Sequence, residues 1–178
     1  MLAFRYAIVA AMLTMLPMLP GAMHVAETSQ TEVKWKTLDG AMDEARRTGK
    51  KIMLDVYTDW CGWCKIMHAR TYSDPEVAAY INEHFAPARL NAWEKATLWF
   101  RGYQFPYLAE LKVNQLAYQL LEGDMQYPTT VFLSKHGEVL SPVQGYIDKR
   151  KMMRILRYFA EDHYQSQSWK DFKRSHRN

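Results

Sequence analysis

The sequence has few of the residues and motifs that mark common enzyme classes. Only two of its 178 residues are cysteines. A glycine-rich phosphate loop, a G-x-S-x-G nucleophile motif and an H-E-x-x-H zinc motif are all missing, which argues against nucleotide-dependent, serine hydrolase and metalloprotease functions. The formal net charge is only +4, and basic residues are scattered outside the C-terminal tail. We therefore expect no nucleic-acid partner.

The two cysteines, Cys61 and Cys64, are too close together for an efficient stabilising crosslink. Closing so short a loop removes little entropy from the unfolded chain, and secreted domains held by disulfides usually carry more cysteines at wider spacing. A C-x-x-C pair is typical of a redox-active dithiol, but it is also half of a zinc site. His68 could share a helix face with Cys64, so metal binding stays the alternative. We predict no metal site, because there is no further cysteine.

The first 26 residues have the features of an export signal. Arg5 precedes an apolar run over residues 7–16, which has the length of a signal-peptide core and is too short to span a bilayer comfortably. Pro17 and Pro20 end this run. We predict a signal peptide over residues 1–26, with an uncleaved membrane anchor as the alternative, and one folded domain over residues 27–178. That domain would be periplasmic or secreted.

Hydrophobic spacing after the signal segment alternates between helical and strand patterns. Thr37 can cap a helix that ends before Gly49, and Ser73 can cap another in a capping box. A helix from Cys61 to about Ala69 is also expected. Further expected elements are strands at 51–58, 85–91, 129–133 and 138–144, a hairpin at 98–105, and helices ending at Gly123 and spanning 147–159. Their order predicts an α/β fold with a mixed sheet, against which the tail packs through Trp169 and Phe172.

The position of the two cysteines at a helix start predicts different roles for them. Cys61 would face free backbone N–H groups that favour its thiolate, whereas Cys64, one turn further in, would be more buried. Cys61 is therefore the predicted nucleophile, and Cys64 the thiol that resolves the mixed disulfide. Gly62 lets the turn bend and leaves room for a partner chain. Trp63 offers an apolar surface beside the sulfurs.

The segment Asp-Val-Tyr-Thr-Asp-Trp-Cys-Gly-Trp-Cys-Lys, residues 55–65, resembles the active-site segment of the thioredoxin superfamily. Tyr127-Pro128-Thr129 resembles its cis-proline loop, and Gly145 matches the glycine after its last strand. The resemblance covers residues 33 to 160 approximately, and a secreted bacterial thioredoxin-like subfamily is the most similar. It implies a thioredoxin-like fold, a central mixed sheet flanked by helices, with an insertion at about 92–127 before the cis-proline loop.

The resemblance also implies roles for individual residues. Asp55, six residues before Cys61, would be a buried acid that accepts a proton from Cys64. Arg89 stands where thioredoxins often carry a lysine near this acid, and it cannot exchange a proton at neutral pH. The residues implied to bind substrate are Trp60, Gly62, Trp63, Tyr127, Pro128 and Gly145. The dipeptide between the cysteines is Gly-Trp instead of Gly-Pro, so the direction of electron flow stays open.

The sequence therefore predicts an extracytoplasmic protein-disulfide oxidoreductase, most simply a reductase, with no cofactor beyond the redox-active Cys61–Cys64 disulfide. Its partners would be protein thiols and disulfides. A membrane protein would supply electrons, because an exported chain cannot reach cytosolic thioredoxin reductase. We expect a monomer. The alternative is a metal-binding or chaperone module on the same fold. The aromatic residues of the insertion could line a partner groove or form a small core of their own.

Overall fold

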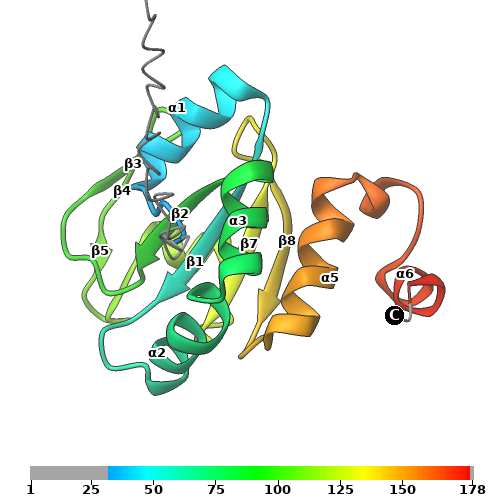
Figure 1. Cartoon of the computed structure of the whole chain (residues 1–178). Coiled ribbons are helices and arrows are strands. Elements are labelled where there is room, and N and C mark those ends of the chain that lie inside the picture. Colours follow the sequence, from blue (N-terminus) through cyan, green and yellow to red (C-terminus); the bar gives the residue numbers. More distant parts are fainter. Residues whose placement is uncertain (1–31, 177–178) are drawn as a thin grey trace, which may run out of the picture.

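The computed structural model describes residues 32–176, so the predicted signal segment lies outside the described residues. A four-stranded sheet with the order β2-β1-β7-β8 forms the centre of the domain (Figure 1). Strand β1 (Lys51–Tyr57) runs parallel to β2 (Phe85–Asn91) and antiparallel to β7 (Thr129–Leu133). Strand β7 is in turn antiparallel to β8 (Val139–Gln144). The predicted α/β class and mixed sheet are confirmed.

The helices from the C-x-x-C motif onward, α4 excepted, cover one face of this sheet (Figure 1). They are α2 (Gly62–Met67), the π-helical segment η1 (His68–Tyr72), α3 (Pro75–His84), α5 (Lys149–Ala160), the short η2 (His163–Gln165) and α6 (Trp169–Ser175). Phe132 of β7 stacks on Phe159 of α5, with ring centroids 4.1 Å apart. Phe172 of α6 is buried, 5.1 Å from the ring of Tyr158, so the tail packs against the domain as predicted.

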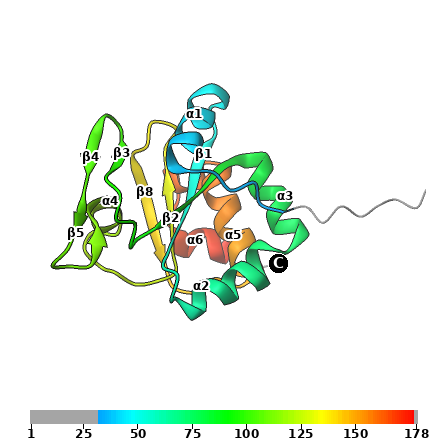
Figure 2. The same ribbon diagram turned by 90° about the vertical axis from the view of Figure 1, so that its left-hand side faces the viewer.

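The insertion covers the other face together with α1 (Leu38–Thr48) (Figure 2). It comprises β3 (Leu98–Phe100), β4 (Tyr103–Phe105), β5 (Tyr107–Leu108), β6 (Val113–Asn114) and α4 (Gln115–Leu120). Phe100 and Phe105 belong to the same buried cluster as Leu54 of β1 and Ala41 of α1. These two aromatic residues therefore form part of the main core and do not make a separate one.

Strand β1 is covered on both faces, which explains its nearly continuous apolar sequence. Leu54 and Val56 belong to the core beneath α1, whereas Met53 belongs to the core beneath the helices of the opposite face. Strands buried on both sides read as apolar runs without alternation. Asp55 is the exception, and its side chain is carried into the interior. No helix within residues 32–176 combines the length and the apolar character that a membrane span requires.

Polar side chains cap the first turns of the helices, and the cap of one helix differs from the prediction. Thr37 caps α1 as expected, because its hydroxyl accepts a hydrogen bond from the Gly40 N–H at 3.2 Å. Helix α3 is capped by Asp74 and not by Ser73. The Asp74 carboxylate accepts bonds from the backbone N–H groups of residues 76 and 77. Pro75 occupies the first helical position, so the residue directly before it becomes the cap.

Turns of the insertion rest on residues with positive φ, which are Arg101, Gly102, Lys112, Glu122 and Gly123. Arg101 and Gly102 have φ of 54° and 84°, which is the two-residue hairpin turn that matches strand twist, at the predicted position. Helix α4 ends at Leu120, earlier than predicted, because Glu122 and Gly123 also take positive φ. The active-site helix differs as well: α2 is followed by the π-helical η1, so helical structure continues past Ala69.

The side chain of Asn114 holds separate segments of the insertion together. Its side chain is fully buried, and its amide nitrogen lies 3.1–3.2 Å from the backbone oxygens of Glu94, Ala96 and Phe105. Its amide oxygen caps α4 by accepting from the Leu116 N–H at 2.9 Å. One buried amide thus links the first residues of the insertion to β4 and to α4.

We predict that Asn114→Ala lowers the free energy of unfolding by about 3 kcal/mol, because it leaves several buried backbone groups without their partner. Urea denaturation followed by tryptophan fluorescence would measure this loss. Gln119→Ala, at an exposed position of the same helix, should change the value by less than about 0.5 kcal/mol. Equal stability of the two variants would contradict the role given to Asn114.

Candidate active site

Cys61 and Cys64 form a disulfide at the start of α2. The sulfur atoms are 2.07 Å apart, and Cys61 is the N-cap residue, whose Sγ accepts a hydrogen bond from the Cys64 N–H at 3.0 Å. Cys61 therefore lies at a helix start, as expected, and its role as the thiolate nucleophile stays a prediction. The prediction that Cys64 is more buried than Cys61 is wrong for the disulfide form. Both residues are 5% exposed, because each sulfur covers the other.

Asp55 is buried beneath the site and paired with Arg89. The two residues are register partners on the parallel strands β1 and β2. Asp55 is only 2% exposed, and the Arg89 Nε donates a hydrogen bond to its Oδ2 at 3.0 Å. The guanidinium lies 4.0 Å from the ring centroid of Tyr57 and 5.7 Å from that of Trp35. Arg89 thus places a positive charge beside the acid, where lysine is common in the superfamily.

The surroundings of Asp55 move its titration toward neutral pH. Burial raises the pKa of Asp55 to about 6, although the charge and the hydrogen bond of Arg89 lower it in part. Tyr72 is fully buried nearby, and its hydroxyl lies 3.1 Å from Oγ1 of Thr130. Burial, and next the charge of Asp55, raise the pKa of Tyr72 well above its ordinary value. With this pKa, Asp55 can exchange a proton near pH 6.

A cavity of about 260 Å³ opens beside Cys64. The residues that line it are Tyr57, Thr58, Asp59, Cys64, Lys65, His68 and Arg89. The Thr58 hydroxyl is buried and has no hydrogen-bond partner within residues 32–176. Burial, and next the charge of Arg89, lower the pKa of His68. Polar side chains, among them those of Thr58, His68 and Arg89, therefore line the cavity on one side of Cys64.

Exposed aromatic side chains surround the disulfide on the outside. Trp60 and Trp63 are 56% and 59% exposed. The Trp60 ring lies 5.9 Å from that of Tyr127 and 5.3 Å from that of Trp93, whereas the Trp63 ring lies 5.6 Å from that of Tyr146. Trp60 and Trp63, both predicted to bind substrate, therefore lie beside Trp93 and Tyr146. Trp93 is one of the insertion's aromatic residues that the sequence offered as lining for a partner groove, whereas sequence reasoning did not assign Tyr146 to the site. Tyr146 directly follows Gly145, and that position is a signal available in the sequence.

The cis-proline loop lies where the resemblance implied. The Tyr127–Pro128 peptide bond is cis, and the carbonyl of Pro128 accepts a hydrogen bond from the Gly145 N–H at 2.8 Å. Gly145 has a φ of 83°, a conformation that favours glycine. Gly62 is exposed between the cysteines, and a side chain there would meet open space. Pro128 and Gly145 therefore form one small loop assembly.

Metal binding has no support in the described residues. Within residues 32–176, no group of three or more His, Cys, Asp or Glu side chains is placed so that it could hold a metal ion. His68 lines the cavity beside Cys64, but further ligands are not assembled around the pair.

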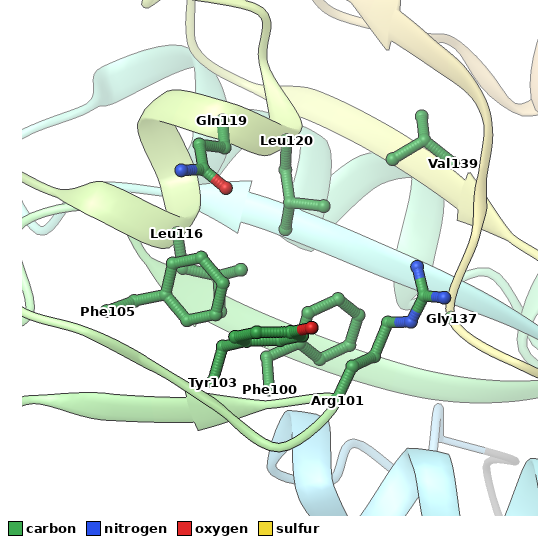
Figure 3. A pocket seen from close by; sticks show the side chains of 9 residues that line it. All are labelled: Phe100, Arg101, Tyr103, Phe105, Leu116, Gln119, Leu120, Gly137 and Val139. Carbon is green, nitrogen blue, oxygen red and sulfur yellow. The ribbon is translucent and has the colours of Figure 1, made fainter.

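A second hollow, of about 470 Å³, lies beneath α4 and carries no redox group. Figure 3 shows its walls: the rings of Phe100, Tyr103 and Phe105 face the space below Gln119, and the Arg101 side chain extends toward the β7–β8 turn. Arg101 is the charged residue in a lining that is otherwise mostly apolar. The disulfide and its surroundings are therefore the better candidate for the active site.

Comparison with known proteins identifies the family. Residues 38–160 match the model of a thioredoxin-like domain family, and the chain belongs to this family. Two solved structures share the fold. A DsbH oxidoreductase has a TM-score of 0.57 and 14% identity over 80% of this chain and 94% of its own. A thioredoxin from Thermus thermophilus has a TM-score of 0.54 and 21% identity over 72% of this chain and 87% of its own.

A stronger sequence similarity is confined to a short segment. The thiol:disulfide interchange protein DsbD of Escherichia coli strain K12 is 46% identical over 63 residues. That segment is 32% of this chain and only 11% of the relative. The similarity therefore concerns a small part of a much longer protein, and the activity of the whole relative does not transfer with it.

We predict that Asp55→Asn raises the free energy of unfolding of the oxidised protein at pH 8 but has little effect at pH 4. In the folded protein the pKa of Asp55, about 6, exceeds the ordinary aspartate value of 3.8. The native state therefore holds the proton more tightly, and the ionisation of Asp55 costs stability as the pH rises from about 4 past 6. At pH 8 the cost is on the order of 3 kcal/mol, and a neutral amide avoids it.

Urea unfolding at several pH values would measure this effect. The exposed Asp39 of α1 offers a matched control, since Asp39→Asn should keep the wild-type pH dependence. A gain for Asp55→Asn that is the same at pH 4 and pH 8 would contradict the assignment of a raised pKa to Asp55.

Proposed function

We propose that this protein is a thiol–disulfide oxidoreductase that reduces disulfides of other proteins outside the cytoplasm. The observation that carries the proposal is the Cys61–Cys64 disulfide at a helix start, ringed by exposed aromatic side chains. A stabilising disulfide would have no need of such a surface. A redox centre needs one, because it must receive a polypeptide. The name of the relative from E. coli, a thiol:disulfide interchange protein, supports the same chemistry.

The reaction would proceed through a mixed disulfide. In the reduced protein, the Cys61 thiolate attacks one sulfur of the substrate disulfide, and the other substrate sulfur leaves as a thiolate and takes up a proton. Cys64 then attacks the Cys61 sulfur, which releases the second substrate thiol and forms the Cys61–Cys64 disulfide. Two electrons pass to the substrate. The Cys64 N–H, 3.0 Å from the Cys61 sulfur, supports Cys61 as the thiolate that begins the reaction.

Asp55 would accept the proton that Cys64 loses. With a pKa of about 6, its carboxylate is mostly ionised at pH 7 and still basic enough to take a proton. Arg89 holds the carboxylate through a hydrogen bond of 3.0 Å. Thr58 and His68 line the cavity beside Cys64, and they would connect this proton to solvent.

The side of the domain that carries the disulfide would also bind the substrate. Trp60, Trp63 and Tyr127 would contact the substrate chain, which would pair with the backbone at Pro128 near Gly145. The export signal predicted for residues 1–26 would place the domain in the periplasm or the exterior, and a membrane protein would then return electrons to the disulfide. The protein would act as a monomer, with the redox-active disulfide in place of any other cofactor.

We expect Cys64→Ser to accumulate a mixed disulfide with oxidised insulin, because the resolving thiol is gone. Cys61→Ser is the matched control and should form no such adduct, since Cys64 is placed as the attacking group of the second step only. Non-reducing electrophoresis and mass spectrometry would identify the adduct. Equal adducts from both variants would contradict the assigned order of attack.

We expect the Cys61–Cys64 pair to have a reduction potential near that of thioredoxin, about −270 mV. Equilibration of the protein with glutathione buffers would measure it. A value near about −120 mV would overturn the reductase direction and indicate an oxidant that donates disulfides. A pair that fails to exchange would overturn the oxidoreductase function itself.

A further inference from the structure

Trp93 lies outside the active-site motif in sequence but beside it in space. It lies two residues after the last residue of β2, Asn91. Strand β2 runs parallel to β1, so both strands end at the edge of the sheet where the cysteine motif begins. The Trp93 ring lies 5.3 Å from that of Trp60, which lies 5.9 Å from that of Tyr127. Three segments that are distant in sequence thus form one row of aromatic rings, which we call the aromatic row.

Hydrogen bonds hold Trp93 in this position. The side-chain oxygen of Asn91 accepts from the Trp93 N–H at 3.0 Å, and its amide nitrogen donates to Asp59 at 2.9 Å. The Ala92 N–H donates to the Tyr57 carbonyl at 2.8 Å. The turn before Trp60 and the start of the insertion are therefore tied together. A surface that is fixed in advance loses less conformational entropy when it binds a partner.

A role for Trp93 in packing alone does not fit its surroundings. The insertion supplies Phe100 and Phe105 to the core, where they are 6% and 9% exposed. Trp93 is 42% exposed, and the ring it contacts, Trp60, is 56% exposed. The contact between them therefore leaves a large apolar surface open to solvent. Clustered exposed tryptophans are typical of binding surfaces.

The disulfide decides what kind of partner this surface can take. Trp60 directly precedes Cys61, and Tyr127 directly precedes Pro128. Any partner that reacts at Cys61 must therefore bring its sulfur next to the aromatic row. A polypeptide places the side chains that flank its cysteine within reach of the row, whereas glutathione carries no apolar side chain that could occupy it.

We propose that Trp93 is a specificity-determining residue that selects substrate cysteines flanked by an aromatic or large aliphatic residue. The proposal rests on the proposed function. The flanking side chain packs against Trp93 and Trp60 while the Cys61 thiolate attacks the neighbouring sulfur. The insertion thereby gives the domain a preference among polypeptide disulfides without changing the redox chemistry at the cysteines.

The test compares Trp93→Ala with Trp99→Ala in the full chain. Trp99 is also exposed, at 56%, and lies on β3 of the same insertion, so it is a matched control. The substrates are two peptide dimers of equal length, each linked by one disulfide, with either Phe or Ser beside the cysteine. Reduction of glutathione disulfide provides a readout that does not depend on the aromatic row.

We expect Trp93→Ala to lower kcat/KM for the Phe peptide on the order of tenfold, as loss of an aromatic contact at a binding surface does. The Ser peptide and glutathione disulfide should change less than about twofold, and Trp99→Ala should change none of the three. Trp93→Phe should restore most of the preference. Circular dichroism would confirm that the thermal midpoints of the variants agree.

Several results would overturn the proposal. An equal loss on both peptides would assign Trp93 to general positioning, and an unchanged preference would remove it from the binding surface. A preference left intact while sedimentation shows a lost dimer would make the aromatic row a self-association surface. If the wild-type protein reduced neither peptide nor glutathione disulfide, the proposed function itself would fail, a result distinct from the other three.

Discussion

The candidate site depends on one constraint: the carboxylate of Asp55 lies on a strand that is buried on both faces. Strand β1 lies between two layers of the fold, so solvent cannot reach Asp55 from either side. Arg89, its register partner on β2, supplies the compensating charge through a hydrogen bond of 3.0 Å. The compensation is incomplete, and the pKa of Asp55 remains near 6. On an edge strand or an exposed helix the same acid would be solvated and ionised far below neutral pH.

The direction of the strands brings the remaining parts of the site together. Strands β1 and β2 are parallel, so Cys61 and Trp93 both emerge at the same edge of the sheet. Strand β7 is antiparallel to β1 and begins at this edge, directly after Pro128. Strand β8 returns to the edge and ends before Gly145, whose N–H bonds to the Pro128 carbonyl. Four segments thus meet without any long loop that reaches toward the cysteines.

Local signals predicted much of this arrangement, and contacts between distant segments account for the rest. Cys61, Asp55 and Pro128 stand in short motifs, so their places could be predicted from sequence. The hairpin of the insertion was also predictable, because its turn contains Gly102, and glycine readily takes the positive φ found there. The contacts between the insertion and the rest of the domain could not be predicted. Phe100 packs into the core and Trp93 joins the aromatic row, and nothing in the local sequence states which aromatic residue faces which layer.

The surroundings of Cys61 also bear on the direction of electron flow. Each group that stabilises the Cys61 thiolate favours the reduced protein and so makes the disulfide more oxidising. Here α2 is only six residues long before the π-helical η1, and the Cys61 sulfur accepts one backbone hydrogen bond, from Cys64. The thiolate therefore receives moderate stabilisation. A moderately stabilised thiolate keeps its nucleophilicity, because nucleophilicity falls as the thiol pKa falls. This balance supports the reductase direction that we propose, in which the two cysteines give electrons to substrate disulfides.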